Sequence, residues 1–216
     1  MSIFTEITSP DSSDILFVFM FKKIKRYKRR AGLAPEKRNP SRQPLNKYRI
    51  LSKKILLLSD THSYIDDTIL KYVALADEVW HAGDIGDLAV TDALKKIKPL
   101  RAVYGNIDDA KARMEFPLHN RFMCEGVEVW ITHIGGYPGK YNPAIKAEMA
   151  ANSPKLFICG HSHILKVMFD KKYDLLHMNP GACGKSGFHQ VRTMLRFVIE
   201  GDKIKDLEII EIEKRA

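Results

Sequence analysis

The sequence predicts an α/β fold in which two mixed β-sheets pack face to face with helices outside. Between residues 53 and 104, short apolar runs alternate with amphipathic segments, which is typical of parallel strands joined by helices. From residue 122 onward the pattern changes to pairs of strands joined by short turns. Several apolar runs are continuous, as expected for strands that are covered on both faces.

The first part of this fold is a series of parallel strands and helices. Residues 55–58, Ile-Leu-Leu-Leu, form the first strand. Asp66 can cap a helix that carries apolar residues on one side, namely Ile69, Leu70, Val73 and Ala76. A strand at 78–81, a helix at 88–96 and a strand at 100–104 follow. This order predicts parallel pairing with right-handed crossovers.

The second part consists of hairpins and one helix. Residues 122–124 and 127–131 are strands joined by the turn Glu125-Gly126. A helix is expected at 142–150, with Pro143 in its first turn. The remaining strands are expected at 156–159, 165–169, 175–178, 191–199 and 204–212.

The first 53 residues differ from the rest, so we expect a basic, disordered extension at 1–53 and a folded domain at 54–216. Residues 22–54 hold 14 Lys or Arg against the single acidic residue Glu36, and residues 1–21 hold three acidic residues. The net charge of +9 therefore leaves residues 55–216 at about −1. Three interpretations stay open: an anchor for nucleic acid or an anionic surface, an inert tail, or translated sequence upstream of the true start.

The apolar run at 15–21 predicts neither a transmembrane segment nor an export signal. It is shorter than the roughly 20 residues that a membrane-spanning helix needs. It also follows acidic residues and precedes basic ones, the reverse of a secretory signal. The three cysteines, Cys124, Cys159 and Cys183, are widely spaced and suggest no disulfide framework. We therefore expect a cytoplasmic protein, with an oligomer left open.

Side chains that bind metal ions follow five of the predicted strands. The carboxyl ends of such strands meet at one edge of a sheet, so we expect these residues to lie close together. Two carboxylates, one amide and four imidazoles are too many for one ion that keeps an open position. They suit two divalent ions about 3.5–4 Å apart. In chain order the residues are Asp60, His62, Asp84, Asn106, His133, His161 and His163.

The nitrogen and oxygen ligands indicate which metals are suitable. Without a thiolate, the set disfavours a structural zinc or an iron–sulfur cluster. It favours manganese, which we expect, with nickel, iron, cobalt or catalytic zinc as alternatives.

The order of these motifs resembles that of the calcineurin-like metallophosphoesterase superfamily. The motifs are Asp60-x-His62, Gly83-Asp84, Gly105-Asn106, His133 and Gly160-His161-x-His163. The short chain and the segment Met178-Asn179-Pro180-Gly181 resemble the small prokaryotic phosphodiesterase branch of that superfamily. The resemblance covers about residues 54–216 and implies a four-layer αββα sandwich.

The resemblance also implies a role for each ligand. Asp60, His62 and His163 would hold one metal ion, and Asn106, His133 and His161 the other, with Asp84 bridging both. A water between two divalent ions loses its proton near neutral pH, and the hydroxide attacks phosphorus in line with the leaving oxygen. We therefore expect a hydrolase of small phosphodiesters, with Asp84, Asn106 and His133 in the catalytic site.

One position departs from the superfamily pattern. Many members carry a histidine directly after the Gly-Asn pair, whereas this chain has Ile107, followed by Asp108 and Asp109. Asp108 is our candidate for orienting Asn106 or a metal-bound histidine, with an ordinary loop carboxylate as the alternative. No residue is assigned as the general acid.

The remaining histidines have other expectations. His81 lies within an apolar strand and is expected to be a hydrogen-bonded core residue. His119 and His177 are expected to be structural or exposed. His189 and Lys185 are candidates for contacts with the substrate.

Two further functions compete with the phosphodiesterase. One is a phosphomonoesterase, either a nucleotidase or a protein phosphatase. The other is a non-enzymatic scaffold of the kind found in the retromer coat, whose centre is impaired. Because all seven ligand positions hold competent donors here, the enzyme is favoured over the scaffold.

Overall fold

The computed structural model describes residues 52–214, so the predictions for the basic extension fall outside the described residues. The first half contains β1 (Ser52–Leu58), α1 (Asp67–Leu75), β2 (Glu78–His81), α2 (Ala89–Lys95), β3 (Leu100–Ala102) and α3 (Ala110–Glu115). The second half contains β4 (His119–Cys124), β5 (Val127–Thr132), β6 (Gly136–Tyr137), β7 (Lys140–Tyr141), α4 (Pro143–Ala151), β8 (Leu156–Ile158), β9 (Leu165–Asp170), β10 (Leu175–Pro180), β11 (Val191–Glu200) and β12 (Lys203–Lys214).

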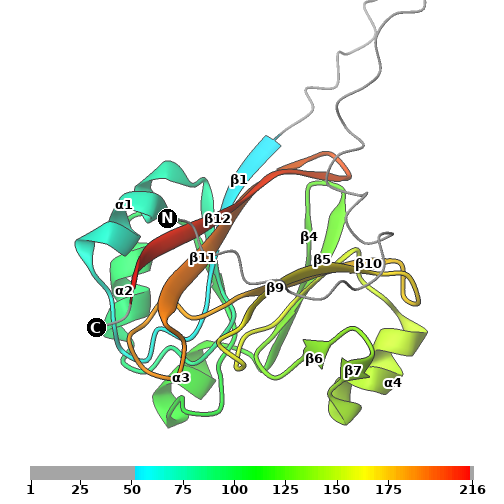
Figure 1. The fold of residues 1–216 in the computed structure, drawn as a ribbon, viewed down its shortest axis with the longest axis horizontal. Coiled ribbons are helices and arrows are strands. Elements are labelled where there is room, and N and C mark those ends of the chain that lie inside the picture. Colours follow the sequence, from blue (N-terminus) through cyan, green and yellow to red (C-terminus); the bar gives the residue numbers. More distant parts are fainter. Residues whose placement is uncertain (1–51, 215–216) are drawn as a thin grey trace, which may run out of the picture. The chain divides into compact units, whose positions relative to one another are not determined.

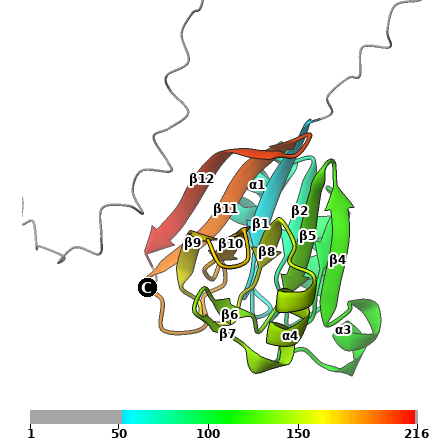
Figure 2. The same cartoon turned by 90° about the vertical axis from the view of Figure 1, so that its right-hand side faces the viewer.

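Two five-stranded sheets form the centre of the domain (Figure 1). In the first, with the order β12-β11-β1-β2-β3, the strands β1, β2 and β3 are parallel and β11 is antiparallel to β1. In the second, β4-β5-β8-β10-β9, the three central strands are parallel and both edge strands are antiparallel (Figure 2). The predicted pair of mixed sheets is confirmed.

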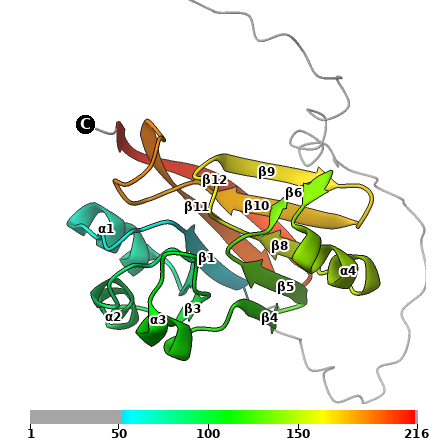
Figure 3. The ribbon, with the colours of Figure 1, turned by 90° about the horizontal axis from the view of Figure 1, so that it is seen from below.

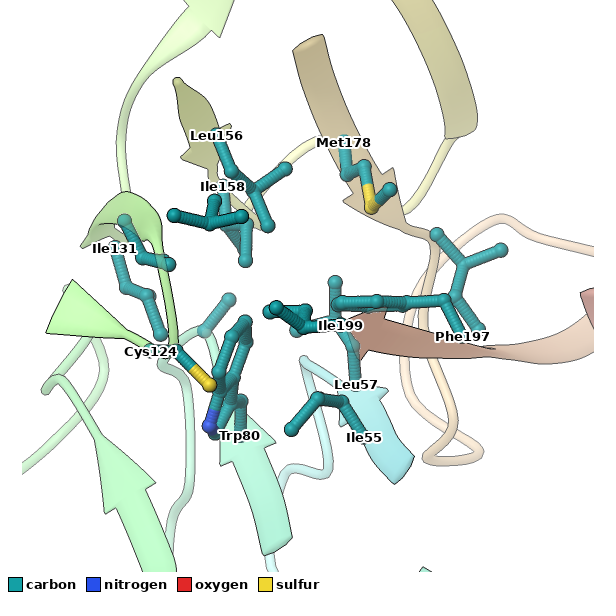
Figure 4. Packing of buried hydrophobic residues seen from close by; sticks show 14 of the residues in the cluster. Ile55, Leu57, Trp80, Cys124, Ile131, Leu156, Ile158, Met178, Phe197 and Ile199 are labelled. Carbon is teal, nitrogen blue, oxygen red and sulfur yellow. The ribbon is translucent and has the colours of Figure 1, made fainter. Parts of the chain in front are cut away.

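Strand β1 shows why the sheets form layers. Its side chains alternate, so Ile55 and Leu57 point toward the second sheet, while Leu56 and Leu58 pack with residues of α1 and α2. Between the sheets, Trp80 is fully buried and lies among apolar side chains that come from both sheets (Figure 4). It meets Phe122 and Phe197 edge-on. The continuous apolar run of β1 therefore reflects burial on both faces, as predicted.

The outer face of the second sheet is covered by α4. Asn142 caps this helix by accepting a hydrogen bond from the backbone N–H of Ala144, and Pro143 occupies its first position. Ile145 and Met149 pack in one cluster with Trp130, Phe157 and Tyr141. Figure 3 shows α1, α2 and α3 on one side of the sheets and α4 on the other, which gives the order helix, sheet, sheet, helix.

Three short elements differ from the sequence-based expectation. Strand β3 ends at Ala102 rather than at residue 104, because the N–H of Tyr104 bonds to the carbonyl of Pro117 instead of to a strand. Helix α3 was not predicted; Asp109 caps it through the N–H of Ala112. The β6–β7 hairpin was also not predicted, although the Pro138-Gly139 pair between its strands is a turn signal.

Within residues 52–214, none of the helices has the length and apolar composition needed to span a bilayer.

Candidate metal centre

The ligand-type residues lie in the loops after the carboxyl ends of neighbouring strands. Asp60 follows β1, Asp84 follows β2, and Asn106 follows β3, all in the first sheet. His133 comes directly after β5, and His161 follows β8 in the second sheet. Figure 3 views the molecule from below, toward these loops. Both sheets therefore contribute to the same edge.

The first group of candidate ligands consists of Asp60, His62 and His163, each offering one atom within 4.8 Å of the others. Nε2 of His62 lies 3.2 Å from Nε2 of His163, and the latter lies 3.2 Å from Oδ1 of Asp60. Asp60 is fully buried. Two imidazole nitrogens this close, beside a buried carboxylate, are arranged to share a cation.

The second group consists of Asp84, His133 and His161, with the same spacing. Nδ1 of His133 lies 2.8 Å from the carbonyl oxygen of Ala82, which can only accept, so Nδ1 carries the proton. Nε2 is then left with a lone pair, 3.1 Å from Oδ1 of Asp84. This buried nitrogen has no hydrogen-bond partner among the described residues. A metal ion would satisfy it, so these residues fit the divalent ion that the ligand set predicts.

Asp84 faces both groups. Its Oδ1 lies 3.1 Å from Nε2 of His133, and its Oδ2 lies 3.7 Å from Nε2 of His62. The N–H of Ile107 donates to Oδ1 at 3.2 Å. Burial alone would raise the pKa of Asp84, but His133, this N–H and His62 together hold the pKa below its usual value. The carboxylate is thus ionised at neutral pH and positioned between the two groups.

The pKa of His133 is shifted by the same contacts. Its burial works to lower the pKa, but the carboxylates of Asp84 and Asp60 and the carbonyl of Ala82 raise the pKa above its ordinary value. The surplus negative charge of the two carboxylates therefore attracts a cation to this place.

The backbone at the ligands is strained. Five ligands have a positive φ, which non-glycine residues rarely adopt and which costs of order 1–3 kcal/mol each. Backbone hydrogen bonds hold these loops together: the N–H of Asp60 donates to Gly83, and the N–H of His62 to Asp84, both at 3.0 Å. Strain held by crossed hydrogen bonds is typical of functional sites. The five are Asp60 (55°), His62 (47°), Asp84 (54°), His161 (69°) and His163 (57°).

Glycine is required where the loops approach the ligands. A Cβ on Gly105 would lie 2.1 Å from Oδ1 of Asp84, and a Cβ on Gly83 would lie 2.6 Å from Nδ1 of His133. Neither atom can move without displacing a ligand. The Gly-Asp and Gly-Asn pairs of the sequence are therefore explained by close packing at this edge.

Asn106 and Asp108 lie in the loop that follows β3. Asn106 is exposed, and its backbone carbonyl oxygen accepts a hydrogen bond from Arg113 at 3.2 Å. Asp108 is 3% exposed, and its two oxygens accept the backbone N–H groups of Gly86 and Gly105, each at 2.7 Å. Asp108 thus joins the loop that carries Asp84 to the loop that carries Asn106, through backbone amides rather than ligand side chains.

Two histidines are buried outside the ligand groups. His81 is hydrogen-bonded to Thr61 at 2.9 Å and to the N–H of Gly83 at 3.1 Å, so the predicted core role is confirmed. Nε2 of His177 donates to the carbonyl of Gly136 at 3.0 Å. Burial lowers the pKa of both residues to about 4, which keeps them neutral at pH 7.

His119 was expected to be structural or exposed, whereas His189 and Lys185 were candidates for contacts with the substrate. His119 is exposed on β4 and hydrogen-bonded to Thr132 at 2.9 Å. His189 lies at the metal edge, with its ring centroid 5.3 Å from that of His163. Lys185 is exposed and lies over the ring of Tyr64, 4.9 Å from its centroid.

A pocket of about 470 Å³ opens beside His161. The β6–β7 hairpin, β9 and β10 contribute to its walls, including Tyr137, Lys140 and Lys166. The sequence did not single out these three residues. Only the Pro138-Gly139 turn signal could have pointed to the hairpin, and nothing local to Lys166 indicates a pocket, because the pocket is formed by distant segments.

Comparison with known proteins gives one family and a set of folds. The model of the calcineurin-like phosphoesterase superfamily domain matches residues 54–202. No curated protein matches the sequence significantly. Among solved structures, an archaeal phosphodiesterase is 21% identical with a TM-score of 0.59, covering 74% of this chain and 99% of its own.

Two further structures share the fold. A predicted phosphoesterase from Streptococcus pneumoniae is 19% identical, with a TM-score of 0.54 and 74% of this chain and 90% of its own covered. Zinc-bound Vps29 from Entamoeba histolytica is 14% identical, with a TM-score of 0.55, covering 73% of this chain and 98% of its own.

Proposed function

The chain belongs to the calcineurin-like phosphoesterase superfamily, and from this premise we propose that it is a metal-dependent phosphodiesterase acting on small phosphodiesters. One observation carries the proposal. Two groups of candidate ligands, each with a carboxylate and two histidines, lie at one edge of the sheets. Asp84, the buried carboxylate of the second group, also faces His62 of the first. One of these histidines, His133, has a buried nitrogen without a hydrogen-bond partner among residues 52–214. This arrangement supports two divalent ions that share one carboxylate.

In this proposal Asp60, His62 and His163 hold one ion, His133, His161 and Asn106 the other, and Asp84 both. When bound, the two ions neutralise charge on the phosphate and lower the pKa of a water toward neutrality. The chain's own contribution is orientation. Ala82 fixes the tautomer of His133 so that Nε2 faces the site, and the backbone N–H of His161 donates to both oxygens of Asp60 at 3.2 Å.

The catalytic group in this proposal comprises Asp84, Asn106, His133 and Asp108. The role of Asp108 is that of a positioning residue, because its oxygens are taken up by the amides of Gly86 and Gly105. It keeps the loop of Asn106 close to Asp84. The predicted contact with Asn106 or a metal-bound histidine is thus replaced in this proposal by contacts with two backbone amides.

The test combines metal analysis with turnover. Wild type should contain about two divalent ions per chain, with manganese giving the highest activity. His161→Ala should lower metal content and turnover together by roughly 10²-fold, since one ligand of a shared centre is removed. The control His119→Ala changes an exposed histidine of β4 and should leave both unchanged. Full turnover by His161→Ala would contradict the proposal.

Phosphomonoesterase activity is the alternative within enzymes. Bis-p-nitrophenyl phosphate and p-nitrophenyl phosphate distinguish the two, because they differ only in the second ester. We expect the diester to have the higher kcat/KM. Much faster turnover of the monoester would favour the nucleotidase or phosphatase. No turnover of either substrate by metal-loaded protein would favour the scaffold.

The compartment and the extension remain proposals. Cys124, Cys159 and Cys183 are free and buried, which supports a reducing cytoplasm.

If the extension at residues 1–53 binds nucleic acid, the affinity of the full chain should fall steeply with salt and be lost on truncation before Ser52. Equal binding by both forms would exclude that role.

A further inference from the structure

The pocket beside His161 is positively charged. Two lysines line it, Lys140 on β7 and Lys166 on β9, and no acidic residue does. Neither lysine forms an ion pair with a described residue. The pocket therefore has a surplus of positive charge that the described chain does not neutralise.

Lys166 reaches this pocket because of its register. In the antiparallel pairing of β9 with β10, Lys166 lies opposite Asn179, which also lines the pocket. Its Nζ lies 4.2 Å from the ring centroid of Tyr137 on β6. This contact holds the ammonium group against the hairpin that forms the opposite wall.

The other titratable groups of the pocket do not offset this charge. Burial lowers the pKa of His177 to about 4, so its imidazole is neutral at pH 7. The hydroxyl of Tyr141 donates to Asp170 at 2.8 Å, and burial together with this carboxylate raises its pKa. Asp170 lies outside the lining and also accepts the N–H of Lys172 at 2.8 Å.

The pocket is also joined to the candidate metal centre. Gly160, His161 and Ser162 line its inner end, and His161 belongs to the second ligand group. Asn179 holds this turn by donating to the carbonyl of Gly160 at 2.8 Å and to Ser162 at 3.1 Å. The volume of the pocket, about 470 Å³, is within the range of small-ligand sites. A substrate at the metal centre thus has space for one arm here.

Apolar side chains complete the wall. Ile134 is 39% exposed, Ile164 64% and Tyr137 40%. A nucleoside would fill such a surface, and a phosphate on that nucleoside would meet the lysines. We propose that this pocket binds a second phosphate, carried on one arm of a nucleotide diester, and that Lys140 and Lys166 select such substrates.

This inference rests on the proposed function, and three dinucleotides test it. Thymidylyl-thymidine has a single internal diester, and its 5′- and 3′-phosphorylated forms add one terminal phosphate. One phosphorylated form should be hydrolysed with a kcat/KM about tenfold higher or more, mainly through a lower KM, since the lysines bind a phosphate that the plain dinucleotide lacks.

The variants assign that preference to the lysines. In the double variant Lys140→Gln/Lys166→Gln the phosphorylated form should be hydrolysed no faster than the plain one. The charge-keeping Lys140→Arg/Lys166→Arg should restore the preference. The control Lys155→Gln removes an exposed lysine that directly precedes β8 and lies outside the pocket, so this variant should keep the preference. Equal kcat/KM of wild type on all three dinucleotides, or an unchanged preference in the double glutamine variant, would overturn the inference.

A binding measurement separates failure of this inference from failure of the proposed function. Metal-loaded wild type should bind thymidine 3′,5′-bisphosphate about tenfold more tightly than thymidine 5′-monophosphate, and the double glutamine variant should bind both equally. If no diester is hydrolysed but this difference is present, the phosphodiesterase proposal fails and the assignment of a phosphate-binding pocket stands. If the two nucleotides bind wild type equally, the pocket assignment fails whatever the turnover.

Discussion

Glu78, the first residue of β2, and Asp84, which lies in the loop after β2, are buried carboxylates with different kinds of partner. Glu78 is 4% exposed and accepts hydrogen bonds from Trp80 at 2.9 Å, from Lys53 at 3.0 Å and from Arg101. Asp84 is 3% exposed and faces His133 and His62.

The difference between these two partner sets indicates which end of the strand needs an ion. Lysine and arginine are permanent cations, so the charge of Glu78 is balanced within the chain. Imidazoles are cationic only when protonated, and one nitrogen of His133 has no hydrogen-bond partner in the described part of the chain. The two carboxylates are equally buried, but they differ in their partners. At the start of β2, which we call the closed end, the charge of Glu78 is balanced by cations of the chain. Beyond the end of β2, which we call the open end, the partners of Asp84 leave a place for a metal ion.

The largest effect should come from removing the charge at the open end. Asp84→Asn should lower turnover by roughly 10³-fold and abolish binding of the second ion, because the charge of the carboxylate that faces both His133 and His62 is lost. The free energy of unfolding of the metal-free variant at pH 7 should be lower than that of wild type, because the lowered pKa of Asp84 means that its contacts favour the ionised form in the folded chain. Metal analysis, turnover and urea denaturation measure these effects. Retention of two ions would show that Asp84 is not shared.

His81, between the two carboxylates on β2, gives a pH dependence. Its Nδ1 accepts a hydrogen bond from the N–H of Gly83. Protonation of Nδ1 would break this hydrogen bond and leave a positive charge buried. The folded pKa of about 4 is lower than the ordinary 6.5, so the unfolded chain binds the proton first as pH falls. Stability should therefore decrease from pH 6.5 to pH 4, by about 3 kcal/mol for this residue.

Urea denaturation of metal-free protein at pH 7 and pH 5 measures this. The variant His81→Asn should show a smaller decrease than wild type, because the amide does not titrate. The remaining slope should come partly from His177, whose pKa is also about 4. If the free energy of unfolding decreases equally with pH in variant and wild type, the pKa of His81 is not lowered in the folded chain.

A glycine pair sharpens the comparison at the open end. Gly105→Ala should weaken metal binding by roughly 10–100-fold, because its Cβ would lie 2.1 Å from Oδ1 of Asp84. Gly139→Ala is the control for an added Cβ without a close contact: no atom lies within 4 Å of the added Cβ, although its φ of +88° is positive, unlike that of Gly105. The control should lose about 1 kcal/mol of stability and keep its metal affinity. Equal affinities measured by competition with a chelator would contradict the role of Gly105.

The smallest effect on metal binding should come from a change at Glu78, whose charge is balanced within the chain. Glu78→Gln should lower the free energy of unfolding at pH 7 by about 1–3 kcal/mol, because Lys53 and Arg101 lose their counter-charge. Metal content should stay at the wild-type level. Burial raises the pKa of Glu78, but Trp80, Lys53 and Arg101 together bring it below the ordinary 4.5. The stabilisation is therefore present above about pH 4.5 and lost as pH falls below it, so variant and wild type should converge in acid.

Local sequence determined most of the secondary structure. The strand at 78–81 matches β2, Asp66 caps α1 through the N–H of Ile69, and Glu125-Gly126 is the turn between β4 and β5. These features depend on neighbouring residues, through propensity, capping and turn chemistry. Helix α3 was missed because its six residues bury only Ala112, which leaves almost no apolar pattern to detect.

The sequence by itself determined which residue types follow the strands, and hence that ligands would gather at one edge of the sheets. Only the tertiary structure decided that Asp84 faces both groups, that five ligands adopt a positive φ, and that Lys140 and Lys166 line one pocket with His161. The physical reason is range. Strand ends and caps are set by neighbours along the chain, whereas the direction of a carboxylate and the walls of a pocket depend on contacts between segments far apart in sequence.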